Sequence, residues 1–443
     1  MSLDEKTIQQ YDVDCLLHSW SVQGKTPRPV IARAEGIYLY DTGGKRYYDM
    51  SSQAMNVNIG HGNQKVIQAV KDQMDNFASI GVGWATSVRS ELAKKLLDIS
   101  SDNMGKVFFT LGGAEANENA LKIARMYTGR AKVFSRYRAY HGGTSGAGHL
   151  TGEPRRFPNE IAGSAGFIKF FDPYVYRDNL GFDSDAEASA YYLKALRQQI
   201  IFENPGNVAA VFVETVTGSN GIIIPPDGYL QGLRTLCDEF GILLVCDEVM
   251  AGFGRTGQYF AYQNWGIKPD LVTFAKGVTC GYLPVGGVIV DKKIADYFDD
   301  HVFSCGLTYT GYAAGCAAGV ATLAVYEEEN LIQAAVARGR LLGEILEDLK
   351  ARHKSVGDVR YIGLFSALEL VRDKQTREPL VPYGSDPDRL MPKINGALRA
   401  KGFCCATHNN NIIVAPPLII TEEELRAAMA ILDEVLFTAD QWV

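Results

Sequence analysis

Near the middle of the sequence, an aspartate and a lysine have the types and the spacing for chemistry on an electron-withdrawing ring. An apolar run ends in Asp247, and Lys276 follows later between Ala275 and Gly277. Such a run predicts a buried strand that presents the carboxylate at its end. The carboxylate can pair with a protonated pyridine nitrogen, and the lysine amine can form a Schiff base with an aldehyde. The two residues therefore suggest pyridoxal phosphate (PLP) as cofactor, with Lys276 and Asp247 as the catalytic pair.

Asp247 and Lys276 are also compatible with different roles. A strand that ends in Asp247-Glu248 fits the magnesium-binding strand of a P-loop ATPase as well, and an isolated lysine is usually a solvated side chain. The sequence contains no G-x-x-x-x-G-K-[ST] motif, which argues against the ATPase. It also has no G-x-S-x-G elbow and no histidine or cysteine cluster with metal spacing, so neither a serine hydrolase nor a metal site is expected. A non-enzymatic nucleotide-binding protein is the remote alternative.

Size and composition narrow the function further. A chain of 443 residues is expected to form two or more lobes, because single cores rarely grow past roughly 250 to 300 residues. The net charge of −7 favours small-molecule partners over nucleic acid. Eight cysteines without a C-x-x-C pair, and a polar stretch at 2–11, predict a reducing cytoplasm. No apolar run reaches the ~18 residues of a membrane helix, so no membrane span is expected.

The order of the predicted elements indicates an α/β fold. Residues 36–49 alternate around Gly43-Gly44 and predict a β-hairpin. Helical periodicity follows, and short buried strands then alternate with helices from 106 to 290, which predicts a mostly parallel sheet covered by helices. After Tyr312, two helices and several strands predict a separate α+β lobe, with which the hairpin is expected to pack. The expected division is 1–55, an N-terminal segment joining the small domain; 56–312, the large cofactor-binding domain; and 313–443, the C-terminal small domain.

Further candidate residues follow the strands of the expected sheet. Gly112, Gly113 and Ala114 join a strand to a helix, where backbone N–H groups can bind a phosphate. Tyr140 follows another strand and can lie against a flat ring. Glu214 ends an apolar strand and can face the same cleft. A tight turn, a core tyrosine and a helix cap are the plain alternatives for these positions.

Together these residues resemble the class III (ω-type) aminotransferases, which are fold-type I PLP enzymes. The resemblance extends from 36–41 to 415–424 and is most specific in 247–257 with Lys276. It implies a large domain with a seven-stranded, mostly parallel sheet and a smaller α+β domain built from both ends of the chain. Gly112-Gly113-Ala114 departs from the family's usual Ser-Gly-Ser or Ser-Gly-Ala, so phosphate binding is expected to rely on backbone amides.

The resemblance also implies roles for individual residues. Lys276 would hold the cofactor, Asp247 would pair with the pyridine nitrogen, and Val249 and Tyr140 would sandwich the ring. Thr308 matches a threonine that contacts the phosphate of the neighbouring subunit's cofactor, which implies a homodimer with shared active sites, alone or paired into a tetramer. The complete set of expected cofactor-binding residues is Gly113, Ala114, Tyr140, His141, Glu214, Asp247, Val249, Lys276 and Thr308.

The residues expected around the substrate depart further from the family pattern. Relatives that use α-keto acids often carry an arginine where this chain has Ala406, so Arg138 and His408 are candidates to bind a substrate anion instead. Trp20, Met55 and Trp84 match positions around the substrate, although each can equally be a core residue. Residues 135–143 and 151–156 are similar to the taurine:pyruvate and aminoacyl-CoA β-aminotransferase branch, in which Arg138, Arg155 and Arg156 could meet a sulfonate or a CoA phosphate.

The predicted function is therefore amino transfer by a PLP-dependent enzyme. The expected donor is an ω- or β-amino compound of the taurine, β-amino acid, amine or aminoacyl-CoA type, and the expected acceptor is pyruvate or 2-oxoglutarate. A lyase, racemase or decarboxylase on the same fold is the first alternative, because the same residues serve all of these reactions.

Overall fold

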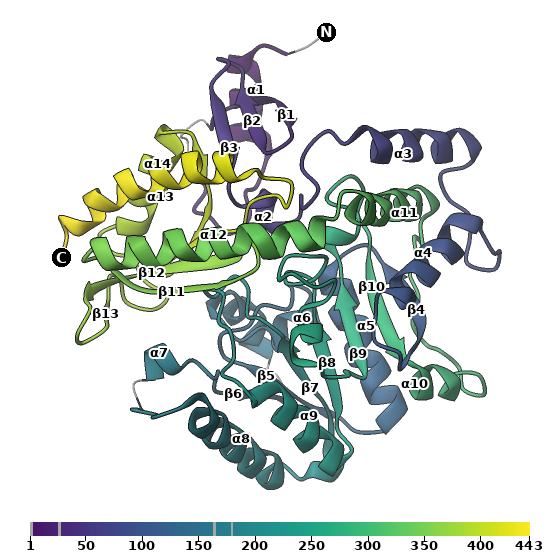
Figure 1. Ribbon diagram of the computed structural model, residues 1–443. Helices are drawn as coiled ribbons and strands as arrows, with labels where there is room; N and C mark the ends of the chain where they lie inside the picture. Colours follow the sequence, from purple (N-terminus) through teal and green to yellow (C-terminus); the bar gives the residue numbers. More distant parts are fainter. Residues whose placement is uncertain (1–2, 25–27, 163–164, 179) are drawn as a thin grey trace.

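A seven-stranded sheet forms the centre of the computed structural model, which describes residues 3–24, 28–162, 165–178 and 180–443 (Figure 1). Its strand order is β4-β10-β9-β8-β7-β5-β6. Strands β9, β8, β7, β5 and β6 are parallel to one another. Strand β10 is antiparallel to both of its neighbours, β4 and β9. In spatial order the strands are β4 (Met104–Thr110), β10 (Gly286–Asp291), β9 (Leu271–Phe274), β8 (Leu243–Asp247), β7 (Val208–Glu214), β5 (Lys132–Arg136) and β6 (Phe167–Phe170).

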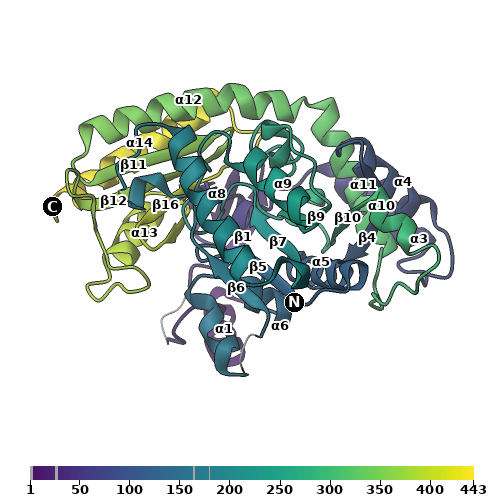
Figure 2. The same cartoon turned by 90° about the horizontal axis from the view of Figure 1, so that it is seen from below.

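Helices cover both faces of this sheet, because its central strands are apolar on both sides. In β7, Val211 and Val213 pack in one cluster with Leu233 of α9, whereas Phe212 packs in another with Ala120 of α5. Figure 2 shows α8 and α9 on one side of β5 and β7, and α5 and α6 on the other. The helices of this region are α3 (Gln64–Asn76), α4 (Ser87–Asp98), α5 (Gly113–Thr128), α6 (Ser145–Leu150), α7 (Val175–Asp178), α8 (Asp185–Phe202), α9 (Tyr229–Phe240), α10 (Lys292–Tyr297) and α11 (Ala313–Glu328), with 3-10 turns η1 (Pro154–Ala162), η2 (Pro205–Asn207), η3 (Ala261–Trp265) and η4 (Lys276–Val278).

The two ends of the chain meet in smaller sheets. Strand β14 pairs in parallel with β3, so the N-terminal hairpin lies against the C-terminal part, as expected. Strands β11, β12, β16 and β15, together with β13 on β12, form a third, antiparallel sheet. The elements are α1 (Glu5–Cys15), β1 (Ile31–Glu35), β2 (Tyr38–Asp41), β3 (Arg46–Asp49), α2 (Ser52–Met55), α12 (Leu331–Arg352), β11 (Val356–Ile362), β12 (Phe365–Asp373), β13 (Glu378–Pro379), α13 (Leu390–Ala400), β14 (Phe403–Cys404), β15 (Ala406–His408), β16 (Asn411–Val414) and α14 (Glu422–Asp440). Helix α11 packs against α3 and α4, so its contacts cross the proposed boundary at 312.

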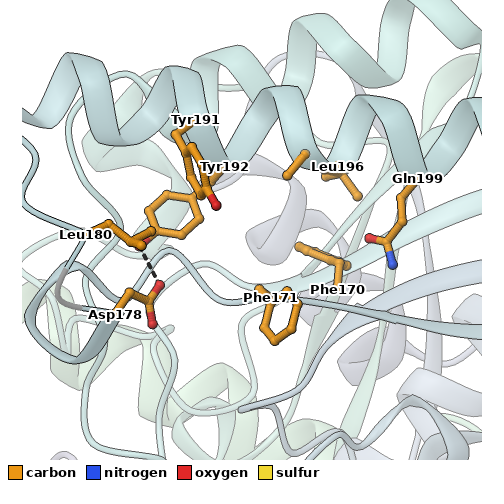
Figure 3. A pocket seen from close by; sticks show the side chains of 9 residues that line it. Phe170, Phe171, Asp178, Leu180, Tyr191, Tyr192, Leu196 and Gln199 are labelled. Atoms are coloured by element: carbon orange, nitrogen blue, oxygen red, sulfur yellow. Dashed lines mark hydrogen bonds between the residues drawn. The ribbon is translucent and has the colours of Figure 1, made fainter.

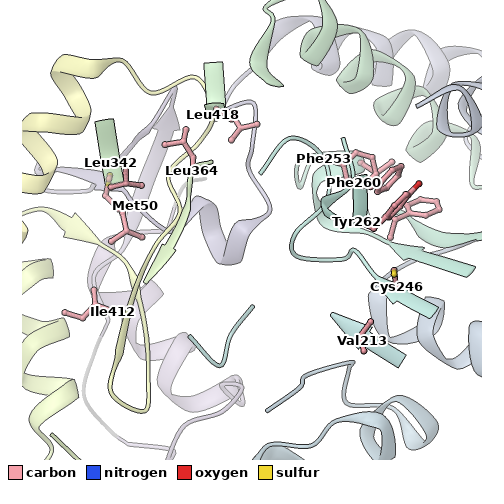
Figure 4. Packing of buried hydrophobic residues seen from close by; sticks show 14 of the residues in the cluster. Met50, Val213, Cys246, Phe253, Phe260, Tyr262, Leu342, Leu364, Ile412 and Leu418 are labelled. Carbon is pink, nitrogen blue, oxygen red and sulfur yellow. The ribbon is translucent and has the colours of Figure 1, made fainter. Parts of the chain in front are cut away.

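A buried arginine joins these parts. The Arg255 guanidinium donates to the carbonyl oxygens of Leu364 and Pro416 and to the side-chain oxygens of Ser52 and Asn58. Figure 4 shows two groups of buried apolar side chains: Phe253 and Phe260 lie in the segment after β8, whereas Leu364 lies near Leu342 and near Met50 from the N-terminal segment. The glycine-rich segment at 252–257 therefore connects the lobes.

The surface carries a separate aromatic pocket of about 280 Å³ between β6, α7 and α8 (Figure 3). Phe170, Phe171, Tyr191 and Tyr192 contribute to its walls, and none of its lining residues belongs to the cavity described below. Within the described ranges, no helix combines the length and the apolar character needed to cross a membrane.

Candidate active site

The candidate site lies at the carboxyl ends of three adjacent parallel strands. Glu214 ends β7, Asp247 ends β8, and the two residues are paired in the ladder between these strands. Lys276 follows β9 after a single residue. Side chains at this edge converge because parallel strands end together. They enclose a cavity of about 160 Å³, lined by Gly113, Ala114, Asn117, Tyr140, His141, Gly142, Glu214, Ser219, Asp247, Val249, Met250 and Lys276.

Asp247 is held by donors on both of its carboxylate oxygens. Oδ2 accepts hydrogen bonds from Asn117 Nδ2 and His141 Nδ1, each at 2.7 Å, and Oδ1 accepts from the Val249 N–H at 3.0 Å. Because a carboxylate only accepts, Nδ1 of His141 must carry a proton. Asn117 is oriented in turn by Thr273 Oγ1, which donates to Asn117 Oδ1 at 2.9 Å. The network fixes a buried negative charge in the cavity wall.

Lys276 is buried and its backbone is strained. Its φ of 49° lies in the left-handed region, which is costly for a residue with a Cβ and is frequently associated with functional sites. Burial lowers the pKa of the amine below its ordinary value of 10.5, while the charges of Asp247 and Glu214 oppose this shift. A lowered pKa makes the neutral, nucleophilic amine available closer to physiological pH. Lys276 therefore has the character of a lysine that attacks an aldehyde.

Glu214 organises the loops beside the cavity. Its Oε1 accepts from the Tyr140 N–H at 2.9 Å, and its Oε2 accepts from the Gly218 N–H at 2.7 Å. Burial raises the pKa of this carboxyl, whereas the charge of His141 lowers it. Glu214 thereby positions Tyr140 against the cavity.

The N-terminus of α5 provides a phosphate-binding position. The helix begins at Gly113, and its N-cap residue, Gly112, has no side chain that could accept from the first N–H groups. The first N–H groups of a helix have no acceptor within the helix and attract anions. A Cβ on Gly113 would lie 2.8 Å from Val249 Cγ1, so only glycine permits this close approach. Gly113, Val249 and Lys276 also line a neighbouring cavity of about 390 Å³, which the left-handed turn at Gln53 and Ala54 borders.

These residues fit PLP in charge and in shape. Asp247 supplies a carboxylate for a pyridine nitrogen, Lys276 an amine for an aldehyde, and the start of α5 free N–H groups for a phosphate. Tyr140 and Val249 contribute to the walls between these groups.

Arg155 packs against Tyr140 and Ser219, two residues that line the cavity, without being one of the lining residues itself. The Arg155 guanidinium carbon lies 3.8 Å from the centre of the Tyr140 ring and 5.2 Å from that of Trp20. Arg155 Nη2 donates to Ser219 Oγ at 2.8 Å, and Nε donates to Glu153. The charge of Arg155 is close enough to contribute to the lowered pKa of Lys276. The site therefore combines a fixed anion, a buried amine and a cation.

Glu153 connects this arginine to the C-terminal lobe. His408 Nε2 lies 3.3 Å from Glu153 Oε2. Burial raises the pKa of Glu153, but His408 and Arg155 outweigh this effect and hold it below its usual value. Glu153 thus stays ionised between two basic side chains.

The other expected substrate residues are not part of the cavity wall. Met55 is 3% exposed and packs in an apolar cluster with Val216 and Ile222. Trp84 is 73% exposed, and Thr308 is also at the surface. Arg138 Nη1 lies 3.6 Å from Asp172 Oδ2 and lines a different cavity. Trp20, although 63% exposed, contacts the Tyr140 ring edge-on with centroids 6.1 Å apart.

Asn117 and Ser219 were missed in the sequence. Asn117 is 1% exposed on α5, and the signal for it was a polar residue on the apolar face of a helix. Ser219 follows Gly218 in a polar turn with no distinguishing pattern. Its role depends on Arg155, which comes from a segment far away in the sequence.

Comparisons with known proteins agree with this geometry. Residues 20–436 match the family described as Aminotransferase class-III. The taurine–pyruvate aminotransferase of Bilophila wadsworthia is 33% identical over 393 residues, covering 86% of this chain and 86% of that protein. A solved taurine:2-oxoglutarate aminotransferase from Bifidobacterium kashiwanohense, in complex with PLP and glutamate, has a TM-score of 0.97 and 46% identity, covering 100% of this chain and 99% of that chain. A solved (S)-enantioselective omega-transaminase from Thermomicrobium roseum has a TM-score of 0.93 and 36% identity, covering 99% of each chain.

Proposed function

This chain belongs to the class-III aminotransferase family, and we propose that its donor is a small ω- or β-amino acid whose other end is a sulfonate or carboxylate. The chain is a PLP-dependent aminotransferase, and the proposed acceptor is an α-keto acid such as pyruvate or 2-oxoglutarate. The observation that carries the proposal is the position of Arg155 against Tyr140 and Ser219, which line the same cavity as Lys276.

The catalytic roles follow from charge and burial. Bound PLP supplies an electron-withdrawing ring that accepts the electrons of the breaking C–H bond at the carbon that bears the donor's amine. In this proposal, Asp247 holds a proton on the pyridine nitrogen, because its carboxylate is buried and fixed by Asn117 and His141. Lys276 Nζ would hold the cofactor at rest and would move the proton that leaves the amine-bearing carbon of the donor. Burial keeps water from competing for that proton.

We propose that Arg155 recognises the anionic end of the donor. Among the described residues, its Nε and Nη2 are engaged by Glu153 and Ser219, which leaves Nη1 to bind a ligand oxygen. Guanidinium pairs well with the planar or trigonal oxygens of carboxylates and sulfonates. Trp20 and Tyr140 flank the guanidinium and reduce its contact with water. A donor amine at Lys276 and an anion at Arg155 would thus be held together.

Arg155 would also replace the arginine that is absent at Ala406. Ala406 and His408 are two residues apart on β15, so their side chains point to the same side of the strand. From this side His408 approaches Glu153, which in turn holds Arg155. The C-terminal lobe then supports the anion-binding residue indirectly, and the keto acid uses the same Arg155 in the second half of the reaction.

We further propose a homodimer with shared active sites. Arg89 donates to the carbonyl oxygens of Ile80, Trp84 and Gly311, so it ties together two stretches of the chain. Both stretches expose large apolar side chains: Ile80, Val82, Trp84 and Tyr309. Thr308 is exposed beside Tyr309, and we propose that in the dimer it contacts the cofactor phosphate of the partner subunit. In light scattering, a single species at the monomer mass would contradict this assembly. We also place the enzyme in a reducing compartment, because its eight cysteines are free thiols.

The test is donor-dependent bleaching of the cofactor absorbance. PLP-loaded enzyme is mixed in turn with taurine, β-alanine, 4-aminobutyrate, a simple amine and a β-aminoacyl-CoA, and then with pyruvate or 2-oxoglutarate. We expect taurine or an ω-amino carboxylate to bleach the band and a keto acid to restore it, with the amino acid formed in equal amount. Steady product formation without a keto acid would instead favour a lyase, racemase or decarboxylase. Preference for the uncharged amine would contradict the role of Arg155.

A further inference from the structure

A second polar cavity, of about 430 Å³, lies between the large sheet and the C-terminal lobe. Arg138 and Arg177 reach it from the segments after β5 and in α7, whereas Arg377 reaches it from the turn between β12 and β13. None of its lining residues also lines the cavity that contains Lys276. It is therefore distinct from the candidate active site.

The arginines of this cavity are held in place by other groups. Arg177 Nε donates to Glu369, and its Nη1 donates to the carbonyl oxygen of Arg377. Arg377 Nη1 donates to the carbonyl oxygen of Tyr176 at 2.8 Å. Glu369 also accepts from Arg360 Nη1 at 2.8 Å, so its negative charge is balanced within the wall. Basic groups are thus fixed around the space before any ligand binds.

Two of these arginines retain donors for a ligand. Arg177 Nη2 is buried and has no hydrogen-bond partner among the described residues. The guanidinium of Arg138 lies over the rings of Tyr174 and Tyr383, and it is 3.6 Å from Asp172, which is longer than a hydrogen bond. Glu378 also lines the cavity, but it is exposed, so water and salt screen its charge.

Asn220 gives independent support for a ligand. It lines this cavity, is only 3% exposed, and neither its Nδ2 nor its Oδ1 has a partner within the described part of the chain. Leaving a buried amide unpaired is unfavourable, and buried polar groups in proteins are nearly always satisfied. A ligand oxygen could accept a hydrogen bond from Asn220 Nδ2. A donor on the ligand, or an ordered water bound with it, could donate to Asn220 Oδ1.

We propose that this cavity is a second binding site, for a small organic acid with a carboxylate or sulfonate group. The arginine donors select an anion, and the volume suits a molecule of the size of an amino or keto acid. Residues of this second cavity are close in sequence to residues of the candidate active site. Asn220 follows Ser219, and Arg138 comes two residues before Tyr140. A bound acid would bridge the large sheet and the C-terminal lobe beside the residues that hold Arg155.

The test is calorimetric titration of the PLP-loaded enzyme with glutarate and with ethanesulfonate. These probes carry the anionic groups but neither an amine nor a keto group, so they cannot react. We expect two sites per subunit in the wild type and one in the Arg155→Gln variant, because that substitution removes only binding in the active site. Binding of glutarate alone would assign the second site to carboxylates, and binding of ethanesulfonate alone would assign it to sulfonates.

Two further variants locate the remaining site. In the Arg155→Gln background, Asn220→Asp places a negative charge in the cavity with little change in shape, and Arg377→Gln removes a positive charge. Each should weaken the remaining binding at least tenfold. Arg372→Gln is the matched control, because Arg372 lies on the same hairpin, is exposed and does not line the cavity. The proposal is overturned if neither probe binds the Arg155→Gln protein, or if both cavity variants bind as tightly as the control.

Discussion

The two halves of the candidate active site are built in different ways. Asp247 and its partners Asn117 and Thr273 belong to one sheet and the helix packed on it, and the hydrogen bonds among them are buried. Arg155, in contrast, belongs to a short 3-10 segment, and its supports come from Glu153 beside it and His408 in the other lobe. The groups for cofactor chemistry are thus carried by rigid elements. The proposed recognition of the substrate anion is carried by segments that can change without altering the sheet.

The largest expected effect tests the rigid half. Asp247→Asn keeps the shape of the side chain but removes the charge that would hold a proton on the ring nitrogen. Amino transfer should slow by roughly a hundredfold or more, as for the loss of a main electrostatic group, while cofactor absorbance is retained. Stopped-flow spectra with taurine measure this rate. A decrease of only a few-fold in the rate of amino transfer would contradict the proposed role of the Asp247 charge.

The next prediction distinguishes substrate binding at Arg155 from the cofactor chemistry at Asp247 and Lys276. Arg155→Gln should raise the KM for taurine by about ten- to a hundredfold, since hydrogen bonds to charged groups contribute about 1.5 to 3 kcal/mol. The rate with an uncharged amine should be nearly unchanged. Arg156→Gln is the matched control, because Arg156 bonds to Glu160 and to the Gly152 carbonyl oxygen instead of to the cavity. An equal loss with both donors would make Arg155 a structural residue.

The pH dependence of cofactor attachment links the two halves. Burial lowers the pKa of Lys276, and Arg155 adds to this shift. The neutral amine should therefore form, and attach the cofactor, with a midpoint below 10.5. Arg155→Gln removes a positive charge near Lys276. Without that charge the protonated amine is more stable, so the midpoint should move upward. Spectral titration of the protein with PLP measures both values. A downward movement would contradict the proximity of the two side chains.

The smallest effect concerns the support from the C-terminal lobe. His408→Gln should raise the KM for taurine by about two- to fivefold, because a partly exposed ion pair contributes up to about 1 kcal/mol. The KM for an uncharged amine should not change. Steady-state kinetics with both donors test this, and an effect as large as that of Arg155→Gln would place His408 on the substrate itself.

The sequence was informative where contacts are local. Strands β5, β7 and β9 lie in the region from 106 to 290 where buried strands were expected to alternate with helices, because short apolar runs are typical of buried strands. Asp247 and Lys276 could be related through strand ends alone. The antiparallel direction of β10 was not predicted, since strand pairing depends on partners that are distant in sequence.

The substrate half was harder to predict for the same reason. Residues 409 and 410 form a turn, and the side-chain oxygens of Asn410 and Asn411 accept hydrogen bonds from the Val381 N–H and from Arg360 Nη2. The link from His408 through Glu153 to Arg155 joins two lobes, and no spacing in the sequence encodes such a contact. Asn117 was missed because a single asparagine in a helix is common and usually lies at the surface.

The most direct test of the central claim is the visible spectrum of the PLP-loaded protein beside that of Lys276→Ala, with taurine and then 2-oxoglutarate or pyruvate added. We predict a band that depends on Lys276, is bleached by taurine and is restored by one of the keto acids. A band that persists unchanged in Lys276→Ala would contradict the assignment of Lys276. A Lys276-dependent band that no anionic amine bleaches would contradict the proposed donor class and leave the cofactor site as described.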